Sequence, residues 1–290
     1  MSERKMLVQL MLVRQLVLFI GTGIGAYTDH RTGLIYDKIT YPMIFLGVLF
    51  NLIELVFGGF TLENAINLYG VGVIVFLIGY VLYITGKLGG GDIKLFTGMA
   101  FLLPFQGELF PLNVFVLQVL FLSAIIAVTF LGVTYTAKYS SIGINWKENL
   151  SGIRKAGFLG IVFIIYFAFF NLYPVAPSFR VNFLAIPIVF ALLFVAFEKG
   201  IKKNFFLKKI SIDALEEDEV IASEFLDEKI KKELSLGLKG VIGEKEKKKL
   251  MELNVKEVPV YRNLPRYGPF IFIGTVIALV FPNAVLFLYA

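Results

Sequence analysis

The segment ITGKLGGGDIKLF, residues 84–96, joins a run of glycines to a charge at the start of an apolar stretch. Three consecutive glycines end at the carboxylate of Asp92, and apolar sequence resumes directly after it. A charged side chain at the edge of the hydrocarbon layer is costly, so residues of this kind usually have a function. The segment therefore predicts a membrane protein with a functional carboxylate at the end of one of its helices.

The composition of the whole chain agrees with a membrane protein. Hydrophobic residues make up 57% of the 290 residues, the mean hydropathy is +0.78, and only 17% of residues are charged. Ordinary globular domains contain roughly 45–50% apolar residues. The net charge of +6 is therefore assigned to basic loops facing the cytoplasm, and not to nucleic-acid binding. The absence of cysteine excludes disulfides, thiol catalysis and cysteine-ligated metals.

Eight apolar segments predict an all-α polytopic membrane protein with about eight transmembrane segments, each needing about 20 residues to span. They are residues 7–27, 41–58, 66–85, 92–104, 112–136, 157–173, 181–197 and 269–288. The fourth is short and ends at Pro104, so its length also fits a partial or re-entrant helix. No internal repeat is evident.

Charge divides the chain into three parts. Residues 199–266 hold 16 of the 28 basic and 13 of the 22 acidic residues, which predicts a small soluble insert. Within it, we expect a helix at the start of 211–240 and short strands around 255–264. Residues 1–198 then form a membrane domain with a catalytic core at about 20–105, and residues 267–290 form the final transmembrane helix.

Basic residues also predict the topology. The insert is expected in the cytoplasm, and counting back through eight spans places both termini outside. The predicted inner loops 28–40, 86–91 and 137–156 carry Lys or Arg, whereas the predicted outer loops 59–65 and 105–111 carry none. The predicted outer loop 174–180 carries only Arg180, and the exception is the N-terminal tail, where Arg4 and Lys5 fall outside. The expected location is the cell membrane, with the fourth segment crossing or nearly crossing it.

Three carboxylates outside the insert, Asp29, Asp37 and Asp92, fall at helix ends on the same predicted face. Two neighbouring carboxylates share a proton, so one activates a water while the other protonates the scissile carbonyl. This is the chemistry of aspartic proteases, and it needs neither metal nor cofactor. Glycines before Asp92 allow the backbone to approach another strand closely.

Other protease mechanisms lack the residues they require. A metalloprotease helix needs His-Glu-x-x-His, and the chain has a single histidine, His30. A serine mechanism normally needs a base near its serine, and no Gly-x-Ser-x-Gly elbow is present.

Two ordered motifs resemble those of the type IV prepilin peptidases, most closely the archaeal preflagellin (prearchaellin) and prepilin peptidases. GGGDIK, residues 89–94, is similar to the family's Gly-x-Gly-Asp-x-Lys, and DHRTGLIYDKITYP, residues 29–42, is similar to its first aspartate motif. The resemblance covers roughly residues 20–105. It implies that Asp29 and Asp92 are catalytic, with Asp37 as the alternative first aspartate. Gly89, Gly91 and Lys94 are implied as supporting motif residues.

The resemblance also implies a substrate. Family members remove the short basic leader from prepilins or preflagellins at the cytoplasmic membrane face, so the expected partners are these precursors and the lipid bilayer. Bacterial relatives usually carry a four-cysteine region linked to N-methylation. Its absence here predicts peptidase activity without methyltransferase activity. The acidic stretch 216–219 of the insert is a candidate contact for a basic leader.

Two alternatives remain open at this stage. One is an intramembrane protease of the presenilin or signal-peptide-peptidase type, which also uses Gly-x-Gly-Asp but carries a Pro-Ala-Leu motif that this chain lacks. The other is a proton- or ion-coupled transporter with paired carboxylates. Such sites normally lie near the midplane, often within inverted repeats.

Overall fold

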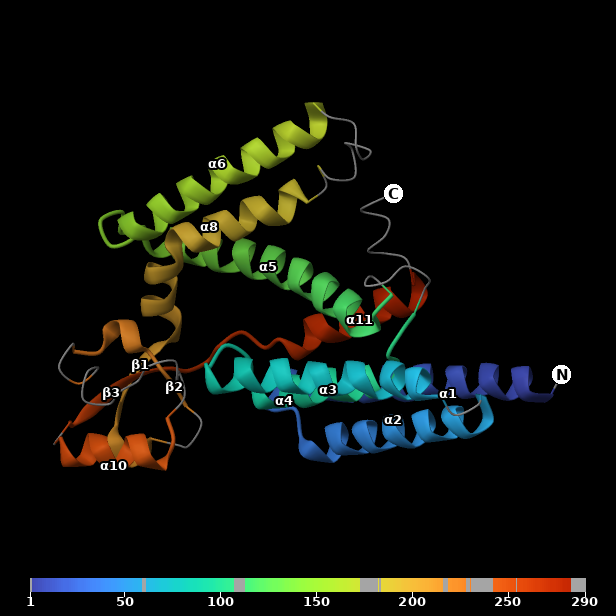
Figure 1. Ribbon diagram of the computed structural model, residues 1–290. Helices are drawn as coiled ribbons and strands as arrows, with labels where there is room; N and C mark the ends of the chain where they lie inside the picture. Colours follow the sequence, from blue (N-terminus) through green and yellow to red (C-terminus); the bar gives the residue numbers. More distant parts are fainter. Residues whose placement is uncertain are drawn as a thin grey trace.

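A helical bundle with a small mixed unit beyond one end forms the described structure of the protein (Figure 1). In this computed structural model the described residues are 2–58, 61–106, 113–172, 182, 184–215, 219–227, 230, 242–253 and 255–282. The apolar helices are α1 (Ser2–Thr32), α2 (Asp37–Gly58), α3 (Leu62–Ile84), α4 (Gly90–Leu102), α5 (Phe115–Ile142), α6 (Leu150–Leu172), α8 (Ala185–Ile201) and α11 (Gly268–Val280).

Each of the eight predicted apolar segments overlaps one of these helices. Five of them, α1, α2, α3, α5 and α6, are long and apolar enough to cross a membrane. The protein is therefore mostly helical with several spans, while the number of eight crossings stays a prediction. Helix α4 has 13 residues and so extends about 20 Å at a rise of 1.5 Å per residue.

Several helix ends differ from the prediction. Helix α1 continues to Thr32 and α2 begins at Asp37, so the predicted loop 28–40 is reduced to four residues. Helix α11 ends at Val280, although the apolar segment runs to residue 288. Proline disfavours a helical conformation in the residue before it, and Pro282 follows Phe281. Residues 283–288 lie outside the described part.

Helix α4 forms the centre of the first group of helices, where α1, α2 and α3 pack around it. Its side chains Leu95, Met99, Ala100 and Leu102 are fully buried. Glycine permits the tight crossing with α2: a Cβ on Gly47 would lie 2.7 Å from the carbonyl carbon of Phe101. The helix that begins with the Gly-Gly-Gly-Asp motif is thus held in place on three sides.

Helix α11 lies between the two groups of helices in Figure 1 and packs against both α1 and α5. The second group continues from α5 to α8 and from α8 to α6. Consequently the last helix connects two parts of the bundle that come from distant parts of the sequence.

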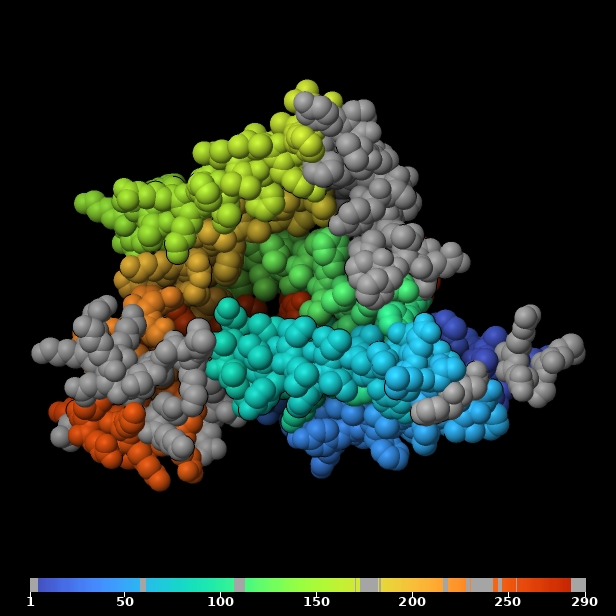
Figure 2. All heavy atoms as spheres, in the orientation of Figure 1, coloured from blue at the N-terminus to red at the C-terminus, as the bar shows by residue number. Residues whose placement is uncertain are grey.

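The insert contains an antiparallel three-stranded sheet in the order β1-β3-β2, formed by Leu207–Ser211, Glu257–Tyr261 and Val220–Ile221. Helix α10 (Glu244–Glu252) accompanies it. The sheet has its own buried cluster, including Ile212, Leu215, Ile221, Leu250, Val258 and Val260. Figure 2 shows α10 and the sheet region projecting beyond the helix ends.

Strand β3 lies inside the segment where the sequence predicts strands. The predicted helix at the start of 211–240 is wrong: residues 211–215 and 219–227 contain the end of strand β1, two 3-10 turns and strand β2. Strand β2 pairs with β3, with Val220 opposite Tyr261. This long-range pairing overrides the local helical propensity. Residues 216–218, 228–229 and 231–241 lie outside the described part.

Candidate active site

Asp29 lies in the last turn of α1, and its carboxylate is buried at 7% exposure. Its Oδ2 accepts a hydrogen bond of 2.8 Å from the backbone N–H of Gly268, the first residue of α11. The helix carrying Asp29 ends because Gly33 adopts a positive φ of 79°, where its N–H bonds the Asp29 carbonyl oxygen at 2.8 Å. Asp29 is therefore fixed on both its side chain and its backbone.

Asp92 lies in the first turn of α4 and is partly buried. Its carboxylate accepts a hydrogen bond from the backbone of Gly89, the residue that caps the helix. An acidic side chain at the third helical position that reaches back to the capping N–H is half of a capping box. This hydrogen bond gives the Gly-Gly-Gly-Asp segment a structural reason for its spacing.

The structure brings these two carboxylates to the same end of the bundle. The end of α1 and the start of α4 pack together, and Asp29 is close enough to Asp92 for the two carboxylates to interact electrostatically. Gly91 makes the approach possible, because a Cβ there would lie 2.9 Å from the Cβ of Ile35 and 3.1 Å from its carbonyl oxygen. The close backbone contact expected from the glycines is made to the chain between α1 and α2.

Asp37 and Lys94 form a separate pair. Lys94 Nζ donates to Asp37 Oδ1 at 2.6 Å and lies 5.0 Å from the ring centroid of Tyr41. The Asp37 side chain is 50% exposed, whereas Asp29 is buried. Lys94 therefore pairs with Asp37 rather than with Asp92, and this pair joins the start of α2 to the start of α4. His30, the single histidine, lies exposed in the last turn of α1.

Two further residues at this end of the bundle, Tyr267 and Gly268, were not predicted from the sequence. The hydroxyl of Tyr267 is 2.9 Å from Ser123 Oγ, and Tyr267 also lies within electrostatic range of Asp92. These residues follow Asp29 by more than 230 positions, so no local pattern connects them to it. The available signal was the Gly-Pro pair that opens the last helix, a common helix start.

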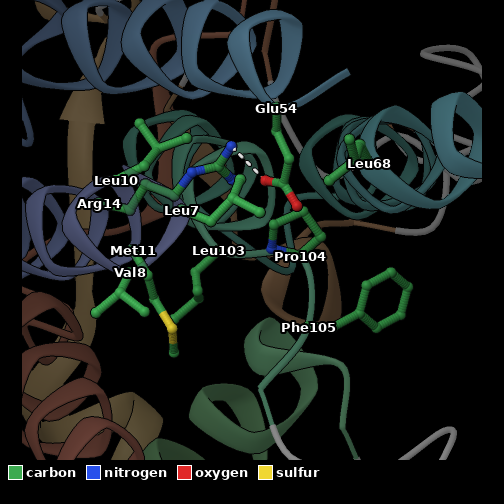
Figure 3. Close-up of a pocket in the computed structure, with 10 residues that line it drawn as sticks. All are labelled: Leu7, Val8, Leu10, Met11, Arg14, Glu54, Leu68, Leu103, Pro104 and Phe105. Carbon is green, nitrogen blue, oxygen red and sulfur yellow. Dashed lines mark ion pairs between the residues drawn. The ribbon is translucent and has the colours of Figure 1, made fainter. Parts of the chain in front are cut away.

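A second polar cluster lies away from the aspartates, in the pocket of about 330 Å³ drawn in Figure 3. Arg14 of α1 is buried there and pairs with Glu54 of α2 at 2.9 Å. It also donates to Asn51 Oδ1 at 2.8 Å and to the Leu102 carbonyl at 3.2 Å. Arg14 precedes Asp29 on α1 by 15 residues, about 22 Å along the helix. We interpret this cluster as a link between α1, α2 and α4.

The acidic stretch 216–219 is described only at Glu219. The Glu219 carboxylate is 13% exposed and pairs with Arg262, so it does not present a free charge to a leader. Nearby, burial and the hydrogen bond to Glu224 raise the pKa of Tyr261, which keeps its hydroxyl protonated. Among the described residues, no group of three or more His, Asp or Glu side chains is arranged to hold a metal ion.

Part of the chain is similar to known proteins. Residues 16–135 match the model of the type IV leader peptidase family. The prepilin peptidase EppA of Methanothermobacter thermautotrophicus is 30% identical over 152 residues, covering 44% of this chain and 38% of that protein. The family match contains Asp29, Asp37 and Asp92, whereas the insert and α11 lie outside it. Residues 16–135 are therefore similar to the type IV leader peptidase family, and the chain spans less than half the length of EppA.

Proposed function

We propose that the protein is a membrane aspartic endopeptidase that removes the short basic leader from prepilin-like or preflagellin precursors. The observation that carries the proposal is the placement of Asp29 and Asp92 at one end of the bundle, both within the segment that matches the family. The similarity to a prepilin peptidase supports the substrate class.

The proposed reaction needs the two carboxylates and one water. The ionised carboxylate takes a proton from the water, whose oxygen attacks the carbonyl carbon of the scissile peptide bond. The protonated carboxyl group donates its proton to the carbonyl oxygen, which gives a gem-diol. Collapse of the diol breaks the C–N bond. The carboxyl group that took the water proton gives it to the leaving amine, and the other carboxylate takes a proton from a diol hydroxyl. Each aspartate returns to its starting protonation state after release of the acid and amine products.

We place the reaction at the cytoplasmic face of the cell membrane. Basic residues gather at the end of the bundle that carries the aspartates: Arg31, Lys38, Lys87, Lys138 and Lys147 all lie in helix ends or connections there. The insert, which is rich in charge, lies beyond the same end in Figure 1. The positive-inside rule supports this orientation.

Cleavage of an authentic precursor tests the proposal. Membranes containing the wild-type protein or Asp92→Asn are incubated with a purified prepilin or preflagellin, and the products are followed by intact mass. We expect the wild type to release the leader at a single peptide bond and Asp92→Asn to release none. Equal cleavage by both would remove the aspartic mechanism, and no cleavage of any precursor by the wild type would favour the transporter alternative.

A further inference from the structure

The start of α11 holds the buried carboxylate of Asp29 through a backbone group. Gly268 N–H donates to Asp29 Oδ2 at 2.8 Å, and the two residues are 239 positions apart. The bond joins the last helix of the described structure to the last turn of the first. A hydrogen bond between a peptide N–H and a carboxylate is stronger than one between neutral groups, so it fixes the side chain firmly.

Only glycine fits at position 268 with this geometry. A Cβ built on Gly268 would lie 2.9 Å from Asp29 Cβ, 2.9 Å from its Oδ2 and 3.2 Å from its Cγ. Contacts of this kind force a shift, and all three involve the proposed catalytic side chain. The Asp29 side chain therefore lies where a side chain at position 268 would begin.

The two residues before Gly268, Arg266 and Tyr267, also fix the start of α11 against its neighbours. The guanidinium of Arg266 packs directly on the backbone of Gly33, which caps α1 four residues after Asp29. A cation there also interacts favourably with the carbonyl end of the α1 dipole. Tyr267 bonds Ser123 of α5 and lies within electrostatic range of Asp92. Consecutive residues thus contact α1, α5 and the region of the second aspartate.

We propose that Gly268 is a positioning residue for Asp29, so that the catalytic centre is built from α1, α4 and the start of α11. The inference rests on the proposed peptidase function and adds a residue from outside the family-matched segment 16–135. Because strand β3 of the insert ends at Tyr261, five residues connect the sheet to Tyr267 and Gly268. The sheet is thereby tied to the helix start that orients Asp29.

A pair of matched glycine substitutions tests the proposal by steady-state cleavage in detergent. Gly268→Ala adds a methyl group against Asp29. Gly274→Ala adds one to the same helix, where it would lie 3.0 Å from the backbone of Ser123 and Val119. The two positions are separated by about 9 Å along α11.

We expect Gly268→Ala to lower kcat about ten- to hundred-fold with KM within about two-fold, because displacing a catalytic group by about 1 Å has an effect of this size. Gly274→Ala should lower the thermal unfolding temperature but leave kcat within about three-fold. A wild-type kcat in Gly268→Ala, or equal losses in both variants, would overturn the proposal.

Hydrogen exchange provides a readout independent of cleavage. Residue-resolved amide exchange of the full chain in detergent is compared for the wild type, Asp29→Ala and Asp37→Ala. The Gly268 amide should exchange at least about ten-fold faster in Asp29→Ala and at the wild-type rate in Asp37→Ala. Unchanged exchange at Gly268 in Asp29→Ala would reject the contact, even if the chain proved to have no peptidase activity. If the exchange result holds while the wild type cleaves no leader, the proposed function fails and the Gly268 contact stands.

Discussion

Both proposed catalytic carboxylates accept a hydrogen bond from a glycine backbone. Asp29 bonds the N–H of Gly268, and Asp92 bonds the backbone of Gly89. Backbone donors impose a fixed direction, because they cannot change rotamer as side chains do. At the scale of single residues, the glycines therefore orient the carboxylates as well as allow close approach of the chain.

The neighbouring glycines Gly90 and Gly91 differ in how closely the chain approaches them. A Cβ on Gly91 would lie 2.9 Å from Ile35 Cβ, whereas on Gly90 it would lie 3.4 Å from a ring carbon of Tyr83, an ordinary contact. We therefore expect Gly91→Ala to lower kcat/KM for leader cleavage at least about ten-fold, because it displaces the start of α4. Gly90→Ala serves as the control and should remain within about three-fold of the wild type. The opposite order would show that α4 is not positioned against Ile35.

The exposed Lys94–Asp37 pair should contribute little. Exposed ion pairs add little to stability, because water and salt screen the two charges. Lys94→Gln, Asp37→Asn and the double variant should each show a denaturation midpoint in detergent close to that of the wild type. The double variant should be no less stable than the more harmful single one. A loss of cleavage in Lys94→Gln alone would instead assign Lys94 a role toward Asp92 or the leader.

At the scale of helices, apolar length predicts where a helix exists but not where it ends. The sequence located all eight apolar helices, yet the predicted segments 7–27 and 41–58 stop short of Asp29 and Asp37. Hydropathy falls at the membrane edge, while backbone hydrogen bonding continues to Thr32 and begins again at Asp37. That Asp29 and Asp92 lie at the same end of the bundle was predictable from their places at two helix ends on one predicted face. The contact from Gly268 was not, because it depends on how α11 packs against α1.

The Arg14–Glu54 pair should stabilise the contact among α1, α2 and α4. Glu54→Leu leaves the buried guanidinium of Arg14 without its carboxylate, which should lower the free energy of unfolding by about 1–3 kcal/mol. Removing both charges in Arg14→Leu/Glu54→Leu should recover part of this loss. Denaturation of the purified variants in detergent measures the effect, and a double variant less stable than Glu54→Leu would show that Arg14 stabilises the fold independently of Glu54.

At the scale of the whole molecule, the aspartates, the helix ends and the insert share one end of the bundle (Figure 1). This arrangement places a charged unit beside the proposed site, connected to it through the start of α11. The sequence predicted a soluble insert from its charge. It did not predict the order β1-β3-β2, because that sheet pairs strands about 40 to 50 residues apart.

The absence of cysteine makes the predicted orientation directly measurable. Lys209→Cys lies in exposed strand β1 of the insert, and Glu63→Cys lies in the exposed first turn of α3 at the opposite end of the bundle. A thiol reagent that does not cross membranes should label Glu63→Cys in intact cells and Lys209→Cys only in inverted vesicles. Labelling of both positions from the same side would contradict the proposed topology.

The most direct test of the account compares kcat/KM for leader cleavage among Asp29→Asn, Asp92→Asn and Asp37→Asn, with each protein shown to be folded by its thermal unfolding. The account predicts losses of at least about 10³-fold for Asp29→Asn and Asp92→Asn, because each removes one of the two groups that move protons. Asp37→Asn should remain within about ten-fold of the wild type. If Asp37→Asn were inactive while Asp29→Asn remained active, the proposed pair would be contradicted, and the first catalytic aspartate would be Asp37.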